Sequence, residues 1–345
     1  MKNIKVLALM SGGLDSSLAV KLILDQGISV IGIKFTSPFC TCDQKGKCFA
    51  KNTAEKLGIP FKIVSKGEEY LKIIRKPKHG YGSGMNPCID CRIFMLKKSN
   101  ENAKEVGAEF IVTGEVLGQR PMSQHLNALK MIEKEAGLKG KILRPLSAKY
   151  LLMTESEIKG WVDREKLLGI TGRSRKIQFE LAKNLGIDEF ACPAGGCLLT
   201  LKEFAKKLRD LFECKRRVAW YDVLLLKVGR HFRFSRSKII VGRNELENKV
   251  LLNRKQKTDY VFEVHNHGSP ITILQGIKNK ESIAIAARLT ARYADHSGDK
   301  ILVKYGNKKP VKNIVVKPLN QKEADVLNLT SLKKELSTNN ISFST

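Results

Sequence analysis

Near its start the chain reads Lys5-Val6-Leu7-Ala8-Leu9-Met10 and then Ser11-Gly12-Gly13-Leu14-Asp15-Ser16-Ser17, and this stretch decides the fold. The first six residues have strand character, and the apolar segment 18–24 that follows has helical spacing. Glycines between a strand and a helix let the backbone approach an anion, and the free N–H groups of the first helical turn point toward it. The stretch therefore predicts a phosphate-binding loop. The alternative is a Ser/Gly turn that caps an ordinary helix.

The spacing of the loop glycines excludes two common phosphate sites. A Gly-x-x-x-x-Gly-Lys-Ser/Thr motif is missing from the sequence, and no Gly-x-Gly-x-x-Gly follows a strand. The loop is therefore neither a Walker loop nor a dinucleotide fingerprint.

Strands and helices alternate in the first half. We predict strands at 5–10, 29–35, 61–64, 110–113 and 142–146, with helices between them that include 52–57 and 91–106. This alternation is typical of an α/β fold with a parallel sheet covered on both faces. Ligands of such sheets bind at the carboxyl ends of the strands, where both Ser11 and Gly114 fall, so we expect these two residues to line one nucleotide crevice.

Length and composition favour two domains without a membrane part. We predict a first domain at 1–210, a second at 215–330 and a flexible tail at 331–345 of the 345 residues. No apolar run reaches the length of a membrane helix, and the start lacks a signal-peptide pattern, so we expect a cytoplasmic protein. The eight cysteines are then metal ligands or catalytic thiols rather than disulfides.

The net charge of +28 predicts a polyanionic partner, with nucleic acid favoured over mere solubility. The helix predicted at 173–186 has a basic start, so Arg173 and Arg175 are candidate RNA contacts. A solvated face on a structural helix is the alternative.

The cysteines suggest a metal or cluster site. Asn86-Pro87-Cys88-Ile89-Asp90-Cys91 places two thiols at a helix start, where the helix dipole favours thiolate. Cys197, or alternatively Cys192, supplies a third thiol, and three thiolates on a cubane cluster leave one iron open. A thioredoxin-like pair and unrelated buried thiols are the alternatives. For Cys40, Cys42 and Cys48, incidental or structural thiols are favoured over zinc or a second cluster, because a fourth ligand is missing.

The loop at 11–17 resembles the pyrophosphate loop of the N-type (PP-loop) ATP pyrophosphatases. Together with the Asn-Pro-Cys-x-x-Cys pair and Gly196-Cys197, it resembles the tRNA thiouridine synthetases, above all the tRNA 2-thiouridylase group, over about residues 1–200. The resemblance implies an adenine-nucleotide α-hydrolase fold, tRNA as substrate, and inorganic sulfide or a persulfide carrier as sulfur donor. It also implies Mg²⁺ oriented by Asp15 and a [4Fe–4S] cluster on Cys88, Cys91 and Cys197, these four being the catalytic candidates. ATP would contact Met10, Ser11, Gly12, Gly13, Asp15, Ser16, Ser17 and Gly114.

The second half resembles the NFACT-R RNA-binding module over about residues 215–330, which implies a smaller basic α+β domain. The strand-like run at 222–227 and the segments 228–233 and 239–248 that follow it carry the resemblance. Arginines interleaved with aromatic residues suit phosphate contact and base stacking, so Arg230, Arg233 and Arg243 are candidate RNA contacts. His231 is either a site residue or, more often for a histidine among arginines, a surface contact.

The expected function is ATP-dependent thiolation of a tRNA uridine, in which a uracil carbonyl is adenylated and its oxygen replaced by sulfur. A tRNA 2-thiocytidine synthase shares the loop and the cluster, and a thiouracil desulfidase shares the cysteines. A non-catalytic RNA-binding factor with a vestigial loop is the alternative of another class, and the intact Ser-Gly-Gly-x-Asp-Ser motif argues against it.

Overall fold

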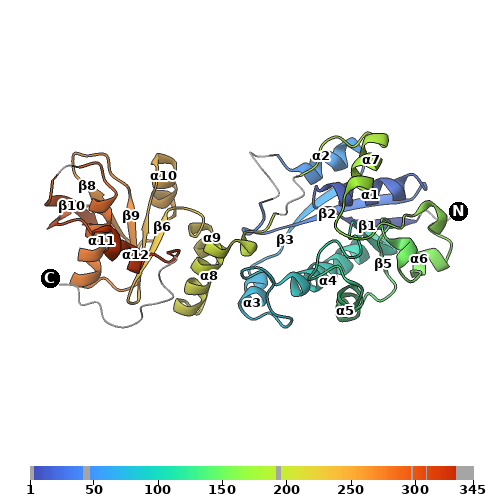
Figure 1. Ribbon diagram of the computed structural model, residues 1–345, viewed down its shortest axis with the longest axis horizontal. Helices are drawn as coiled ribbons and strands as arrows, with labels where there is room; N and C mark the ends of the chain where they lie inside the picture. Colours follow the sequence, from blue (N-terminus) through green and yellow to red (C-terminus); the bar gives the residue numbers. More distant parts are fainter. Residues whose placement is uncertain (1–3, 42–46, 192–195, 297, 308, 332–345) are drawn as a thin grey trace. The chain divides into compact units, whose positions relative to one another are not determined.

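The computed structural model describes residues 4–41, 47–191, 196–296, 298–307 and 309–331 (Figure 1). The chain divides into two compact units, Met1–Leu201 and Lys202–Thr345. The first unit ends before the helix that follows Leu201, whereas the predicted domain extended to residue 210. Cys42, Cys192 and the predicted tail beyond Ser331 lie outside the described residues.

The first unit is built on a parallel sheet with strand order β3-β2-β1-β4-β5, which confirms the predicted fold class. Its fifth strand is shorter than predicted and ends at Leu143, because Pro145 has no N–H to continue the ladder. The strands are β1 (Lys5–Leu9), β2 (Ser29–Thr36), β3 (Phe61–Ser65), β4 (Phe110–Thr113) and β5 (Ile142–Leu143). The helices are α1 (Leu14–Leu24), α2 (Phe49–Lys56), α3 (Glu69–Arg75), α4 (Cys88–Val106), α5 (Leu126–Ala136), α6 (Glu155–Ile158) and α7 (Lys176–Asn184), with short 3₁₀ turns η1 (Ala148–Tyr150), η2 (Arg164–Lys166) and η3 (Leu198–Thr200).

The strand order creates a switch point between β1 and β4. From β1 the chain builds outward through β2 to β3, and it then crosses to the other side of β1 to form β4 and β5. Connections that leave neighbouring strands in opposite directions open a crevice at their carboxyl ends. Ser11 lies two residues after the end of β1 and Gly114 directly follows β4, and both line the cavity at this crevice as predicted.

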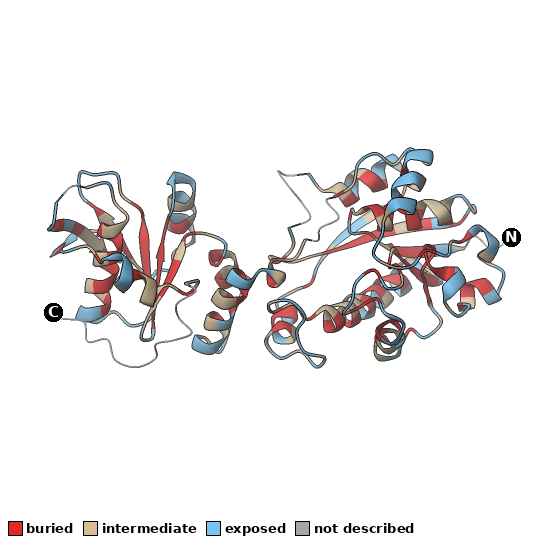
Figure 2. Ribbon diagram, viewed as in Figure 1, coloured by how far each residue is buried: buried red, intermediate tan, exposed pale blue. Residues whose placement is uncertain are grey.

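The two faces of the sheet are covered by different helices (Figure 1). Val6 and Ala8 of β1 pack in the core that includes α1, α2 and α7, while Leu7 packs toward α4 on the opposite face. This alternation follows from the two-residue period of a strand. Figure 2 shows the central strands buried, as expected for a sheet covered on both sides.

The second unit is a six-stranded antiparallel sheet with order β11-β10-β8-β9-β7-β6, in agreement with the predicted α+β domain. Helices α11 and α12 share one core with the sheet, and α9 and α10 border the core on the other face. The strands are β6 (Arg230–Phe234), β7 (Ser237–Val241), β8 (Tyr260–Val264), β9 (Thr272–Gln275), β10 (Ile301–Gly306) and β11 (Lys312–Val316). The helices are α8 (Lys202–Cys214), α9 (Trp220–Leu225), α10 (Glu245–Arg254), α11 (Lys280–Arg292) and α12 (Gln321–Leu327).

The strand predicted at 222–227 is wrong, because this run forms helix α9. A short apolar run is compatible with a buried strand or a buried helix, and local hydrogen bonds decide between them. Asp222 accepts a hydrogen bond from the N–H of Ala219 at 3.0 Å and pairs with Lys215 at 2.7 Å, which fixes the start of the helix. Residues 239–248 belong to two elements. Strand β7 ends at Val241, and helix α10 begins at Glu245. In the part of the chain that the structure describes, no helix has the length and apolar character needed to cross a membrane.

Gly114 is the tightest contact between β4 and the start of α1. A Cβ atom at this position would lie 2.5 Å from the backbone nitrogen of Ser16 and 2.6 Å from the carbonyl carbon of Asp15. Both are backbone atoms that cannot move aside without shifting the helix.

We therefore predict that Gly114→Ala destabilises the first unit by about 1–3 kcal/mol, the usual cost of overpacking. The urea midpoint is followed by the fluorescence of Trp161 in a Trp220→Phe background. Gly169→Ala is the matched control, because its Cβ would meet only side-chain atoms, the exposed ring of Tyr150 at 3.3 Å and the Cβ of Lys149 at 3.4 Å. Equal midpoints for the two variants would contradict the close contact.

Candidate active site

One cavity of about 440 Å³ in the first unit brings together the glycine loop and the predicted thiols. It lies at the carboxyl ends of β1, β2 and β4, since Leu9, Phe35 and Thr113 line it. The predicted site residues among its lining are Met10, Ser11, Gly13, Asp15, Ser16, Cys88, Cys91, Gly114, Arg175 and Cys197. A nucleotide bound at the loop and a group bound at the thiols would therefore share one space.

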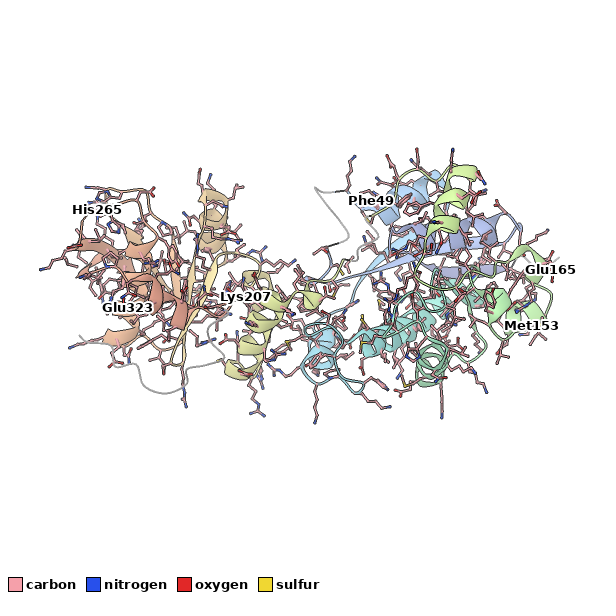
Figure 3. All side chains as sticks on the ribbon, in the orientation of Figure 1. Phe49, Met153, Glu165, Lys207, His265 and Glu323 are labelled. Carbon is pink, nitrogen blue, oxygen red and sulfur yellow. The ribbon has the colours of Figure 1, made fainter. Side chains whose placement is uncertain are left out.

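The loop after β1 leads through two glycines into the start of α1, which has no side-chain cap. Gly12 has φ of +79°, and a Cβ there would lie 2.9 Å from the Cβ of Phe49 (labelled in Figure 3). The carbonyl of Gly12 accepts a hydrogen bond from the N–H of Ala191 at 2.7 Å. Gly13 is the N-cap of α1 and gives the helix no side-chain cap, so the first turn keeps its N–H groups for an anion.

The three loop serines differ in their surroundings. The hydroxyl of Ser11 lies 3.3 Å from that of Ser16, and both residues line the cavity. The Ser16 hydroxyl donates to the Gly13 carbonyl at 2.8 Å. Ser17 is fully buried, and its hydroxyl also donates to the Gly13 carbonyl, at 3.2 Å. It therefore stabilises the loop from the protein interior.

One carboxylate oxygen of Asp15 has no hydrogen-bond partner in the described part of the chain. Its Oδ2 accepts a hydrogen bond from Gln119 Nε2 at 3.1 Å and lies 3.6 Å from Arg175 Nε. Its Oδ1 is buried and makes no hydrogen bond among the described residues. Carboxylate oxygen is a preferred Mg²⁺ ligand, so an orphaned oxygen beside a phosphate loop fits a metal–nucleotide complex. Arg175, predicted as an RNA contact, thus lies against Asp15, while Arg173 is exposed.

Asp90, between the two cysteines, fixes the start of α4. Its carboxylate accepts hydrogen bonds from the backbone N–H groups of Lys78 and His79, both at 3.0 Å. The His79 ring lies 3.2 Å from Asp90 and 3.0 Å from Glu135 of α5. These bonds hold the first turn of α4, and with it Cys88 and Cys91, against the preceding loop.

Lys66 is the charge partner of Cys91. Its ammonium is 3.1 Å from Cys91 Sγ and 4.5 Å from the centre of the Tyr70 ring, and only 8% of Lys66 is exposed. Burial by itself would raise the pKa of the Cys91 thiol, but Lys66 and the Tyr70 hydroxyl bring that pKa below its ordinary value. The structure therefore favours thiolate at Cys91.

The thiols of Cys88 and Cys197 have raised pKa values, so they are protonated more readily than the Cys91 thiol. Burial, together with the neighbouring Cys91, raises the pKa of Cys88, although Arg92 and Arg120 oppose the rise. Burial raises the pKa of Cys197 to about 12. A cation or a cluster bound among the three thiols would supply the positive charge that these two thiolates lack.

A buried ion-pair network supports the cavity wall next to the cysteines. Glu115 is 3.0 Å from Arg144 Nε and 3.4 Å from Arg92 Nε. Burial opposes the ionised form, but the two guanidinium groups keep the pKa of Glu115 below its usual value. Arg120 also lines the cavity; burial and the neighbouring Arg92 lower its pKa, while Cys88 and Asp15 oppose that change.

The thiols are not arranged as ligands of one ion. Among the described residues, no three Cys, His, Asp or Glu side chains are grouped closely enough to hold a single metal ion. A cubane cluster is larger, because each thiolate binds a different iron. Three thiols around one cavity, with Lys66 and Arg92 beside them, fit such a cluster. Cys40 lines the same cavity, while Cys48 lies 3.4 Å from Lys34.

The candidate RNA contacts of the second unit already have partners within that unit. Arg233 makes a two-pronged ion pair with Asp210 at 2.9 and 2.6 Å, and Arg243 pairs with Glu247. The Arg230 guanidinium lies 4.5 Å from the centre of the Tyr293 ring. His231 is no surface contact: it is 1% exposed, and its Nε2 lies 2.8 Å from the Val228 carbonyl.

Sequence reasoning missed Lys66, Tyr70 and Asp90. Lys66 lies just after the end of β3 and Tyr70 is in α3, and no motif marks either as a neighbour of a cysteine 20 or more residues later. Asp90 carried a signal, since it stands inside the Cys-x-x-Cys motif at the start of a helix, where carboxylates are favoured.

Both units match known protein families. Residues 2–151 match the family described as thiamine biosynthesis protein (ThiI), and residues 229–326 match the NFACT protein RNA binding domain. The tRNA-specific 2-thiouridylase MnmA of Deinococcus radiodurans is 31% identical over 123 residues, which cover 32% of each chain. A probable tRNA sulfurtransferase of Thermococcus kodakarensis is 33% identical over 145 residues, covering 41% of this chain and 36% of the relative.

The chain spans about a third of the length of these curated relatives. A solved structure of the U34-tRNA thiolase NcsA from Methanococcus maripaludis with its [4Fe-4S] cluster aligns with 66% of this chain and 74% of that one. Its identity is 18% and its TM-score 0.31, a likeness too low to bear on the chemistry of the present chain.

We predict that Lys66→Met moves the alkylation of Cys91 by iodoacetamide to higher pH, because the thiolate loses its charge partner. The reaction is followed by peptide mass spectrometry on iron-free protein in a Cys88→Ser background. Lys62→Met, which removes an exposed lysine of β3, is the matched control and should leave the profile unchanged. An unshifted profile for Lys66→Met would show that the ammonium does not act on this thiol.

Proposed function

Because a ThiI-family domain and an NFACT RNA-binding domain are joined in this chain, we propose that it is an ATP-dependent tRNA sulfurtransferase that thiolates a uridine. The observation that carries the proposal is the shared cavity. A phosphate loop with an orphaned carboxylate oxygen and three half-buried thiols all face it. This pairing suits a reaction that activates a base with ATP and then delivers sulfur to the same base.

In the first step a uracil carbonyl oxygen attacks the α-phosphorus of ATP. The new oxygen–phosphorus bond forms as the bond to the β-phosphate breaks, and pyrophosphate leaves. The N–H groups of the first turn of α1 stabilise the charge that develops on the phosphates. Arg175 and Arg120 add positive charge on the cavity side of Asp15. Mg²⁺, held through Asp15 when bound, would polarise the phosphate oxygens as a Lewis acid.

In the second step a sulfide attacks the activated ring carbon. The carbon–oxygen bond breaks, AMP leaves with the former carbonyl oxygen, and the thiocarbonyl remains on the base. Inorganic sulfide supplies this sulfur directly, and a persulfide carrier supplies it when a thiol attacks the inner persulfide sulfur, releases hydrosulfide and ends as a disulfide with the carrier.

Cys88, Cys91 and Cys197 would hold a [4Fe–4S] cluster in this enzyme. When bound, the cluster supplies a Lewis-acidic iron that has no protein thiolate. Lys66 offsets the negative charge of Cys91, and Asp90 keeps the Cys pair at the cavity wall. Arg92 adds a further positive charge beside the thiols, and its ion pair with Glu115 holds it in place.

An RNA substrate explains the high positive charge of the chain and the presence of the second unit. A base inside a folded RNA must be turned out of its stack to enter a cavity of this kind, and a strong grip on the RNA backbone offsets that cost. The net charge of +28 and the NFACT RNA-binding domain supply such a grip. We infer tRNA as the RNA because the relatives matched by the first unit are described as tRNA-modifying enzymes.

The direct test is nucleoside mass spectrometry of tRNA from cells with and without the gene. We expect the loss of one uridine-derived thionucleoside, 2-thiouridine or 4-thiouridine, and its return with the wild-type gene. Loss of 2-thiocytidine would instead select a cytidine thiolase. An unchanged set of thionucleosides would overturn the proposal and favour a non-catalytic RNA-binding factor.

We predict that Asp15→Asn lowers tRNA-dependent pyrophosphate release about 10²–10³-fold, the effect typical of removing one preorganised charge-stabilising group. The release is measured by a coupled phosphate assay with purified protein. Asp25→Asn, at the far end of the same helix, should retain full activity. Unchanged release in Asp15→Asn would remove this carboxylate from the mechanism.

We predict that Cys197→Ala loses bound iron and thiolation while it keeps its affinity for tRNA. Iron content, the absorbance of anaerobically purified protein and filter binding of tRNA give three separate readings. Cys214→Ala, which removes an exposed thiol of the second unit, is the control and should behave as wild type. Full iron and activity in Cys197→Ala would transfer the role of third ligand to Cys192.

A further inference from the structure

Cys40 and Cys197 face each other across a short antiparallel bridge. The N–H of Thr41 donates to the Gly196 carbonyl at 2.9 Å, and the N–H of Leu198 donates to the Phe39 carbonyl at 2.8 Å. These two hydrogen bonds lie on either side of the cysteines, which exchange no backbone hydrogen bond with each other. Cys40 and Cys197 are therefore a non-hydrogen-bonded antiparallel pair. This is the closer of the two kinds of antiparallel pair, with Cα atoms about 4.5 Å apart and side chains on the same side.

That separation lies within the range at which cysteines form disulfides, since bridged residues have Cα atoms about 4.4–6.8 Å apart. Both thiols are free in the structure and both line the cavity, so small reagents that enter it reach them. The backbone bridge fixes their approach without help from any ligand. Cys48, which follows Cys40 in the described part of the chain, instead accepts a contact from Lys34 Nζ at 3.4 Å.

We propose that Cys40 and Cys197 form a reversible disulfide, which makes Cys40 the redox partner of Cys197. The oxidant is a low-molecular-weight disulfide. One cysteine thiolate attacks it, forms a mixed disulfide and releases one small thiol. The second cysteine then attacks the protein sulfur of the mixed disulfide and releases the other small thiol. Two protein thiols are thus oxidised and one small disulfide is reduced to two thiols.

The proposed disulfide depends only on the backbone bridge between Cys40 and Cys197. Its effect on cluster loading rests on the proposed function. Cys197 cannot bind iron while it is bonded to Cys40. Oxidation of the pair would therefore leave Cys88 and Cys91 without the third ligand, and reduction would restore the set. Cys40 would in this way make cluster loading depend on the thiol–disulfide balance around the protein.

The experiment uses full-length, iron-free protein treated with oxidised glutathione and digested without reduction. Mass spectrometry should find a peptide that links Cys40 to Cys197 and that disappears after dithiothreitol. Cys40→Ser should lack the link, and Cys48→Ser, the matched control, should keep it. A link from Cys197 to Cys88 or Cys91 in the wild type would overturn the proposal. So would the absence of any link under conditions that glutathionylate the exposed Cys214.

Iron uptake separates this proposal from the proposed function. Oxidised wild type should take up less iron than reduced wild type, while Cys40→Ser should load equally before and after oxidation. Equal loading of oxidised and reduced wild type would overturn the regulatory consequence. A disulfide in protein that takes up no iron even when reduced would support the redox pair and reject the cluster.

Discussion

The close packing of Gly114 on the first turn of α1 is the constraint on which the site depends. It lets β4 lie directly beside β1, so that the crevice at the switch point has the phosphate loop on one side. Helix α4, which carries the cysteine pair, leads into β4 and packs on the opposite face of the sheet from α1. A side chain at Gly114 would push the helix of the phosphate loop away from the wall that carries the thiols.

Charges of opposite sign alternate along the cavity. Asp15 lies beside Arg175, Glu115 beside Arg92, and Cys91 beside Lys66. Each pair is at least partly shielded from water, where electrostatic interactions are stronger and where their orientation is set before any ligand arrives. In the proposed function the same wall would receive the phosphates of a nucleotide beside Asp15 and would hold thiolates beside Lys66.

The sequence predicted the parallel sheet, the loop and the Cys pair because each is encoded locally, by apolar runs, glycines and spacing. The run at 222–227 was assigned to the wrong element because its apolar residues suit either a strand or a helix. The hydrogen bond from Ala219 to Asp222 that decides for a helix involves polar groups outside the apolar pattern. The sequence does not predict that Lys66 lies beside Cys91 or that Cys40 lies opposite Cys197, since only the tertiary fold brings these residues together.

The hydrogen bonds of Asp90 have a consequence for the loading of the proposed cluster. They tie the first turn of α4 to backbone groups of the preceding loop, and they involve no sulfur atom. In small zinc domains the metal itself drives folding, so that metal starvation yields unfolded chains. Here the scaffold around the thiols is assembled from a sheet, two helix layers and this carboxylate. Iron shortage would leave a folded apoprotein in the cell, ready to be filled later rather than degraded and made again.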